Sequence, residues 1–168
     1  MKDFSVRLLT ADDAEAMKQI REEALRLHPE SFSADPDSEA RLTVEDWRKR
    51  LEQRACFGAF RNDKLVGIAG YAPKEQKKMA HTGEFGSMYV RKDSRGTGAA
   101  DALIEAALEH AAECVEQLTL MVTAENARAI KLYERHGFRV IGRIPRSLRV
   151  GDRTYDDLLM WRLVSTSD

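Results

Sequence analysis

The sequence has little cysteine and no long apolar run. Its two cysteines, Cys56 and Cys114, lie far apart, which excludes the spacing of a cysteine metal site or of a CxxC redox pair. We expect both thiols to be reduced and mostly buried. The opening residues MKDFSVRLLTADD lack the apolar stretch of a signal peptide, and no later segment approaches the ~20 apolar residues of a membrane-spanning helix. The expected location is the cytoplasm, without membrane contact.

An excess of either charge is also missing. The 27 basic and 28 acidic side chains leave a formal net charge of −1, which gives no general attraction to nucleic acid or to anionic lipid. The segment KEQKK (74–78) has no interleaved aromatic residues, so we interpret it as a solvated loop and expect no nucleic-acid partner. The 168 residues suit one domain with a buried core. No repeat or linker divides the chain, so residues 1–168 are predicted to form a single domain.

Hydrophobic periodicity predicts a mixed α/β fold. We expect Val6 and Leu8 to point inward from the first strand, and Leu27 to belong to the apolar face of the first helix, which Thr10 caps. The predicted order is a strand at 4–10, a helix at 11–27, an irregular loop at 28–40, a short helix at 43–51, strands at 56–60 and 65–71 around a turn, a strand at 80–90, a helix from 99, a strand at 117–122, a helix at 126–136, and strands at 138–144 and 155–163.

A glycine-containing turn, RGTGAADAL (95–103), lies between a predicted strand and a predicted helix. Gly96 and Gly98 permit backbone torsions that other residues resist, and they let a ligand approach main-chain N–H groups. Amides at a helix start favour a phosphate or pyrophosphate, to which Arg95 could add charged hydrogen bonds. A short Gly-x-Gly also occurs in ordinary loops. The P-loop pattern and the three-glycine Rossmann spacing are both missing, so we expect neither an NTP nor NAD.

Two segments carry a family resemblance. MYVRKDSRGTGAADALIEAAL (88–108) resembles the acyl-CoA-binding signature of the GNAT family of N-acetyltransferases, Arg/Gln-x-x-Gly-x-Gly/Ala, with Arg95, Gly98 and Ala100 at its fixed positions. NARAIKLYERHGF (126–138) is similar to the second signature of that family. The order of predicted elements is also similar over nearly the whole chain. The resemblance implies a central mixed, mostly antiparallel sheet flanked by helices, and acetyl-CoA as the acyl donor, with no metal.

The resemblance also implies how the donor is held. The backbone of residues 88–90 would pair with the pantetheine arm, and residues 96–101 would wrap the pyrophosphate. Asn126 would hydrogen-bond the pantetheine, and Tyr133 would lie near the sulfur. The residues expected to bind coenzyme A are therefore Met88, Tyr89, Val90, Arg95, Gly96, Thr97, Gly98, Ala99, Ala100, Asp101, Asn126 and Tyr133.

Amide formation from a thioester needs a neutral amine, stabilisation of the oxyanion and a proton for the leaving thiolate. Glu84 lies where the histone-acetyltransferase branch of the family has its catalytic glutamate, and we predict it as the general base, either buried or acting through a water. His81 is the alternative base. Several protein N-terminal acetyltransferases of the family place a glutamate five residues before the Asn, where this chain has Met121. That difference argues against a ribosomal-protein substrate.

Tyr133 is the candidate general acid for the thiolate. A strand N–H within residues 88–90 would meet the oxyanion if a bulge frees it from the ladder. Neither motif contains a cysteine, which favours direct attack by the amine over a covalent acyl-enzyme. The expected acceptor is a primary amine of a small molecule or peptide. It would meet the loop at 28–37 and the strands at 146–159, where Asp35, Asp37, Asp156 and Asp157 could receive a cation.

Two other functions stay open. A non-catalytic acyl-CoA sensor or scaffold would keep residues 95–100 and could dispense with Tyr133 and Glu84. An enzyme using another acyl group, such as succinyl, would differ in a pocket shape that no motif reports. The sequence does not decide the oligomeric state, and two copies could form a homodimer through their last strands.

Overall fold

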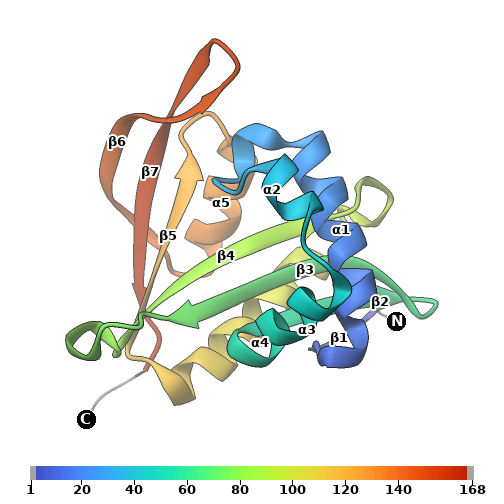
Figure 1. Ribbon diagram of the computed structural model, residues 1–168. Helices are drawn as coiled ribbons and strands as arrows, with labels where there is room; N and C mark the ends of the chain where they lie inside the picture. Colours follow the sequence, from blue (N-terminus) through green and yellow to red (C-terminus); the bar gives the residue numbers. More distant parts are fainter. Residues whose placement is uncertain (1–2, 166–168) are drawn as a thin grey trace.

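A computed structural model describes residues 3–165, through which one seven-stranded sheet runs in the order β1-β2-β3-β4-β5-β7-β6 (Figure 1). β4 and β5 pair in parallel, and all other neighbours are antiparallel. The predicted mixed, mostly antiparallel sheet is confirmed. The strands are β1 (Ser5–Leu8), β2 (Ala55–Arg61), β3 (Lys64–Pro73), β4 (Thr82–Val90), β5 (Gln117–Thr123), β6 (Arg139–Val150) and β7 (Arg153–Leu163).

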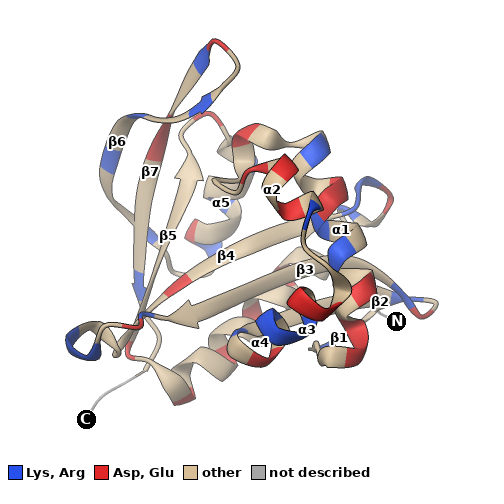
Figure 2. Ribbon diagram, in the orientation of Figure 1, with Lys and Arg blue, Asp and Glu red and all other residues tan. Residues whose placement is uncertain are grey.

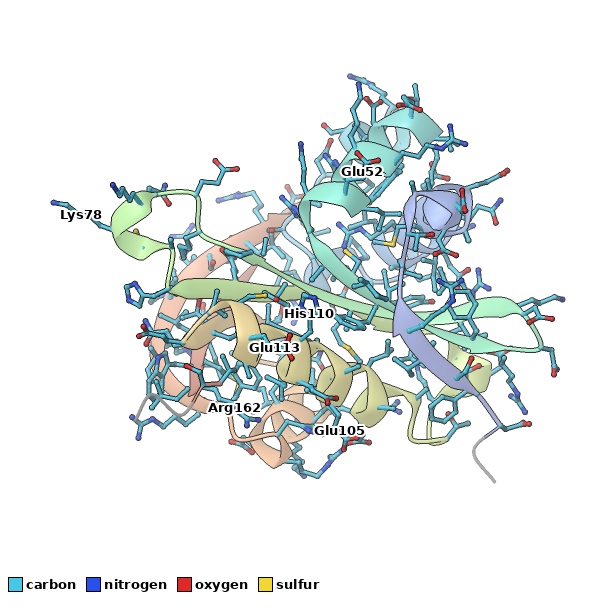
Figure 3. The ribbon with its side chains drawn as sticks, turned by 90° about the horizontal axis from the view of Figure 1, so that it is seen from below. Glu52, Lys78, Glu105, His110, Glu113 and Arg162 are labelled. Carbon is cyan, nitrogen blue, oxygen red and sulfur yellow. The ribbon has the colours of Figure 1, made fainter. Side chains whose placement is uncertain are left out.

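Helices cover both faces of the sheet. They are α1 (Ala14–Leu27), α2 (Pro36–Ala40), α3 (Val44–Gln53), α4 (Ala99–Cys114) and α5 (Ala127–Arg135). Figure 3 shows α4, which carries His110 and Glu113, on the opposite side of the sheet from α3, which carries Glu52. Two cores result. Leu103 and Leu118 are fully buried in the core under α4, and Met17 and Ile68 in the core under α1 and α3.

Two expectations from periodicity and one from the usual burial of cysteine are wrong. Leu8 and Leu27 are exposed, because β1 and α1 each end as these side chains are reached, and Leu9 is buried in place of Leu8. Cys114 is exposed at the end of α4, whereas Cys56 is buried, and burial raises the pKa of the Cys56 thiol. Neither thiol forms a disulfide.

The expected irregular loop at 28–40 contains a short helix, α2. Asp35 caps it by accepting a hydrogen bond from the Ser38 amide at 2.8 Å, and Pro36 occupies its first turn, where the missing N–H costs nothing. Two prolines and several serines in the sequence pointed to a loop. Here both prolines lie in the first turn of a short helix instead.

The two last strands form a longer hairpin than the sequence predicts. β6 continues past Pro145 and Arg146, where the register shifts and Arg146 has φ +53°. A proline normally indicates that a strand ends, so the sequence pattern does not reveal that β6 continues through this irregular register. Basic residues are spread along this hairpin (Figure 2). β6 is an edge strand and exposes Val140, Ile141 and Ile144.

Within residues 3–165, no helix is long and apolar enough to cross a membrane. The same part of the chain contains no group of three histidine, cysteine or acidic side chains that could hold a metal ion.

Candidate functional site

The parallel pair β4 and β5 separates at the middle of the sheet. Their pairing runs from Thr82 opposite Gln117 only to Glu84 opposite Thr119, while β4 continues to Val90 and β5 to Thr123 (Figure 1). A pocket of about 800 Å³ lies at the diverging ends, within the ~300–1,000 Å³ of small-molecule sites. It is lined by the ends of both strands, by the turn before α4, by α5, and by His28 and residues 30–32.

A bulge distorts β4 beside this pocket. Ile68 faces Tyr89 and Gly70 faces Gly86, so Ser87 and Met88 together face only Ala69 on β3. A bulge of this kind leaves a backbone N–H outside the ladder and increases the local twist. Met88 lines the pocket, whereas Ser87 does not. A strand amide is therefore available at the pocket wall.

The turn before α4 forms one end of the pocket. Gly96 has φ +76° and Gly98 has φ +89°, and a Cβ at either position would meet no protein atom within 4 Å. Both glycines line the pocket. Within the described chain, the amides of residues 96–98, 100 and 101 donate no hydrogen bond. Because these N–H groups surround the start of a 16-residue helix, the turn offers an anion site.

Arg95 is fixed at the mouth of this turn. Its Nε donates to the Val90 carbonyl at 2.9 Å, and its Nη2 lies 3.2 Å from His28 Nε2. These contacts hold the guanidinium against the pocket, which both Arg95 and His28 line. His28 was not among the predicted site residues. It follows α1 and lies 67 residues before Arg95 in the sequence.

The N-terminus of α4 is tied to the C-terminus of α5 through Asp101. Its Oδ1 accepts hydrogen bonds from His136 Nε2 at 2.8 Å and from Arg135 Nη2 at 3.0 Å. Burial acts to raise the pKa of Asp101, but the bonds from His136 and Arg135 outweigh it and lower the pKa. The carboxylate is therefore ionised and already neutralised by its partners, which leaves the neighbouring amides free for an anion.

Asn126 begins α5 at the end of β5. Its Oδ1 accepts a hydrogen bond from the Ala129 amide at 3.1 Å and caps the helix. Asn126 lines the pocket, and its Nδ2 donates no hydrogen bond within residues 3–165. The side chain can therefore cap the helix with its oxygen and still offer two donors to a ligand.

Tyr133 lies about two turns after Asn126, on the same face of α5. Its ring packs edge-on against Phe85 and Phe138, with centroids 5.9 and 6.0 Å apart. Tyr133 is 7% exposed and lines the pocket. Among the described residues, its hydroxyl has no hydrogen-bond partner, and burial raises its pKa well above the usual value. A neutral, proton-bearing hydroxyl thus faces the pocket.

Tyr89 also lines the pocket, but its hydroxyl is committed elsewhere. It donates to Glu23 Oε1 at 2.9 Å, and Glu23 also binds Arg91. Burial, together with the hydrogen bond to Glu23, raises the pKa of Tyr89 to about 12. Of these two tyrosines, Tyr133 is therefore the one whose hydroxyl is available to a bound molecule.

The structure brings together all the predicted coenzyme A residues except Thr97 and Ala99. Thr97 Oγ1 donates to the Ser94 carbonyl at 2.7 Å and accepts from the Ala99 amide at 3.4 Å, so this residue shapes the turn from within. Ala99 is 1% exposed and packs in the core under α4. Neither lines the pocket.

Glu84 and His81 also lie outside the pocket lining. The Glu84 side chain is 60% exposed, and its Oε2 lies 3.7 Å from Lys74 Nζ. Side chains alternate along a strand, and the next residue, Phe85, packs on Tyr133 under α5. Glu84 therefore points to the opposite face, as does Gly86, where a Cβ would meet nothing within 4 Å. His81 is exposed just before β4.

Several pocket residues were missed by the sequence reasoning. Arg128 on α5 lines the pocket and has no ion-pair partner within the described chain. A short turn, Pro29–Ser31, crosses the end of β5, where Thr123 Oγ1 donates to the Glu30 carbonyl at 2.6 Å. Met121, the predicted departure from the N-terminal acetyltransferases, also lines the pocket. An arginine in a helical motif carries no local signal that distinguishes a ligand contact from a solvated charge.

Known proteins share this architecture. Residues 17–138 match the family model described as the acetyltransferase (GNAT) family. The chain is 33% identical over 140 residues to a mycothiol acetyltransferase from Thermobispora bispora, an alignment that covers 79% of this chain and 46% of that protein. The chain thus spans a little under half the length of the curated relatives it matches.

Two solved structures show the same fold over nearly their whole length. An acetyltransferase of the GNAT family from Streptococcus pneumoniae is 25% identical with a TM-score of 0.86, covering 96% of this chain and 99% of that one. A putative acetyltransferase from Salmonella typhimurium, solved with its cofactor acetyl-CoA, is 20% identical with a TM-score of 0.82, covering 98% and 96% of the two chains.

Proposed function

This chain belongs to the acetyltransferase (GNAT) family, and from that premise we propose that it is an acetyl-CoA-dependent N-acetyltransferase acting on a primary amine of a small molecule or peptide. One observation carries the proposal. A single pocket of about 800 Å³ joins the bulged backbone at Met88 with the amides of residues 96–98 in the glycine turn and the hydroxyl of Tyr133, which have no hydrogen-bond partner within residues 3–165. An anion site, an oxyanion donor and a proton donor are three separate requirements of acyl transfer from coenzyme A.

Acetyl-CoA would lie along the pocket from the glycine turn to Tyr133. The amides at 96–98, 100 and 101 and the guanidinium of Arg95 suit the diphosphate. Arg128 on α5 also lines the pocket and suits a phosphate as well, because its charge has no partner within residues 3–165. The unpaired edges of β4 and β5, with the Asn126 Nδ2, suit the amides of pantetheine.

The reaction needs no protein nucleophile. The amine nitrogen bonds to the acetyl carbon, the carbon–sulfur bond breaks, the amine loses a proton and the thiolate gains one. The Met88 N–H meets the charge that develops on the carbonyl oxygen, a role for which a backbone donor in a preformed site is well suited. Tyr133 supplies the proton to the thiolate, whose conjugate acid has a pKa near ~8.5.

The acceptor amine arrives on the face of the sheet opposite α4 and α5. Four aspartates were candidates for receiving its charge. Asp35 caps α2, and Asp156 accepts from Arg143 Nε at 2.9 Å and from the Arg146 amide at 2.8 Å. Asp37 and Asp157 make no hydrogen bond or ion pair within the described chain, but only Asp157 lies directly opposite a pocket residue, Thr123. We therefore favour a cationic acceptor that Asp157 attracts.

Glu84→Gln tests the general base. A lysine-like amine with pKa ~10.4 is neutral in only about one molecule in 2,500 at pH 7, so an accepting carboxylate matters even through a water. Because Glu84 is exposed on the acceptor face, we expect kcat/KM for the amine to fall about 3- to 10-fold, with the dissociation constant of acetyl-CoA unchanged. Steady-state kinetics measure this, with exposed Glu52→Gln on α3 as control. Equal rates for the two variants would leave His81 or solvent as the base.

Asn126→Ser and Asn126→Ala separate helix capping from ligand binding. Serine keeps a capping oxygen, whereas alanine removes it at a cost of about 1 kcal/mol in unfolding free energy. Both lose the Nδ2 donor, so we expect both to weaken acetyl-CoA binding by about 2- to 10-fold, as for one hydrogen bond. Calorimetric titration and thermal unfolding give the two quantities. If the serine variant binds as the wild type does, Asn126 serves only as a cap.

A thiol-release assay tests the function. Purified protein is mixed with acetyl-CoA and a panel of amines comprising an aminoglycoside, a polyamine, amino acids and short peptides, with mass spectrometry of the product. Turnover on one class, faster for cationic than for neutral amines, supports the proposal. Succinyl-CoA in place of acetyl-CoA tests the alternative donor. Tight binding of acetyl-CoA without turnover on any amine would favour the non-catalytic sensor.

A further inference from the structure

Arg21 joins three elements through one buried guanidinium. It lies on α1 and is 6% exposed. Its Nε and Nη2 donate to the two carboxylate oxygens of Glu39 on α2, at 3.0 and 2.8 Å. Its remaining terminal nitrogen, Nη1, donates to Ser87 Oγ on β4 at 3.3 Å. The paired donors toward Glu39 fix the plane of the guanidinium, so the direction of the third contact is also fixed.

Ser87 is an unusual residue for its place. It is the first residue of the β4 bulge, and its φ of +56° lies in the left-handed region that favours glycine or asparagine. A strained residue of this kind persists where the surroundings hold it. The hydrogen bond from Arg21 is such a restraint. The next residue, Met88, carries the backbone that faces the pocket.

From this geometry we propose that Arg21 and Ser87 are positioning residues. The Arg21–Ser87 contact holds the bulge in the one conformation that aims the Met88 N–H at the thioester carbonyl. Through Glu39, the same guanidinium couples this N–H to the position of α2. This helix follows the turn Pro29–Ser31, which borders the pocket. This inference rests on the proposed function, because it concerns how the oxyanion donor is set. Neither side chain touches the reacting atoms.

Ser87 variants test the contact better than Arg21 variants, because loss of Arg21 would leave Glu39 buried without its main partner and disturb folding. Ser87→Ala removes the hydroxyl and keeps the strain. Ser87→Gly also removes the hydroxyl but relieves the strain, so we expect its Tm to be about 2–4 °C higher than that of Ser87→Ala. Ser87→Asn tolerates the left-handed conformation and restores an acceptor for Arg21.

We expect kcat to fall about 10-fold in both the alanine and the glycine variants, with acetyl-CoA affinity and acceptor KM unchanged, since a donor displaced by a fraction of an ångström loses part of its ~100-fold effect. The asparagine variant should recover most of kcat. Asp63→Gly provides the matched control, because Asp63 has φ +60° in the remote β2–β3 turn. It should gain stability and keep kcat.

Isotope-edited infrared spectroscopy of bound [1-13C]acetyl-CoA gives a readout that needs no acceptor. In the wild type, the thioester carbonyl band should move to lower wavenumber on binding, and in Ser87→Ala and Ser87→Gly it should return toward its free position. If the wild type binds acetyl-CoA with no shift, the oxyanion role of Met88 in the proposed function fails. If the wild-type shift is present and both variants keep the shift and kcat, the positioning role of Arg21 and Ser87 is overturned.

Discussion

Replacing Tyr133 by phenylalanine is expected to lower kcat by about 100-fold or more, and to leave the dissociation constant of acetyl-CoA within about threefold of the wild type. The ring makes the packing contacts with Phe85 and Phe138, so the fold and the pocket shape persist without the hydroxyl. Only the proton for the thiolate is lost, and general acid catalysis contributes ~10²–10⁴-fold. Stopped-flow thiol release and calorimetric titration measure the two effects.

The pH dependence sharpens this prediction. Burial raises the pKa of Tyr133 above its usual value near ~10, so the hydroxyl keeps its proton throughout the neutral and mildly alkaline range. The kcat profile of the wild type should therefore show no alkaline decline below pH 10. The raised pKa also makes the free energy of unfolding depend on pH. The buried neutral phenol stabilises the fold fully below the unfolded pKa, and this contribution is lost as pH rises through the folded pKa.

Tyr71→Phe is the matched control. Tyr71 is also a buried tyrosine with a raised pKa, caused chiefly by burial, but its hydroxyl lies 2.7 Å from His110 Nδ1 on α4, outside the pocket. It should lose some stability and keep kcat within about twofold. A Tyr133→Phe enzyme that also keeps its kcat would mean that solvent protonates the thiolate.

Gly98→Ala carries the second large effect, a rise of about 30- to 100-fold in the dissociation constant of acetyl-CoA. With φ at +89°, an alanine strains the backbone by about 1–2 kcal/mol, and the turn relieves this strain by rotating the amides away from the anion site. The new Cβ also projects into open space on the pocket side, where a diphosphate would approach. Together these effects account for the predicted 2–3 kcal/mol, roughly.

Gly151→Ala separates binding from stability. Gly151 has φ +60° in the β6–β7 turn, and a Cβ there also meets nothing within 4 Å. It does not line the pocket. We expect the two variants to lose comparable unfolding free energy, while only Gly98→Ala loses affinity. Equal affinity in both variants would contradict the assignment of the turn as the diphosphate site.

Most residues that the sequence predicts for coenzyme A line the pocket, whereas none of the individual residues that it predicts for the general base or the acceptor does. Gly96 and Gly98 could be found because a positive φ restricts residue choice, and Asn126 because a helix cap has a local signature. Both features are set by neighbours along the chain. The bulge at Ser87 was expected only as a possibility in residues 88–90, because a bulge depends on the register with β3, which a single strand does not encode.

Long-range contacts explain what the sequence did not reveal. Arg21 and Ser87 are 66 residues apart, and His28 and Arg95 are 67 apart, so neither pairing leaves a local pattern. Glu84 is exposed because it lies on a part of β4 that α1–α3 do not cover. The sequence of β4 alone does not show how far these helices extend over the sheet. The exposed Leu27 shows the limit of periodicity, since a helical pattern continues through the last turn whether or not the sheet extends beneath it.

A crystal structure of the protein with acetyl-CoA would show the bound donor directly. We expect the diphosphate on the amides of residues 96–101 with Arg95, the pantetheine between β4 and β5, and the thioester with its carbonyl oxygen at the Met88 N–H and its sulfur at the Tyr133 hydroxyl. Coenzyme A bound outside the pocket, or a thioester out of hydrogen-bonding reach of both Met88 and Tyr133, would contradict the proposed function.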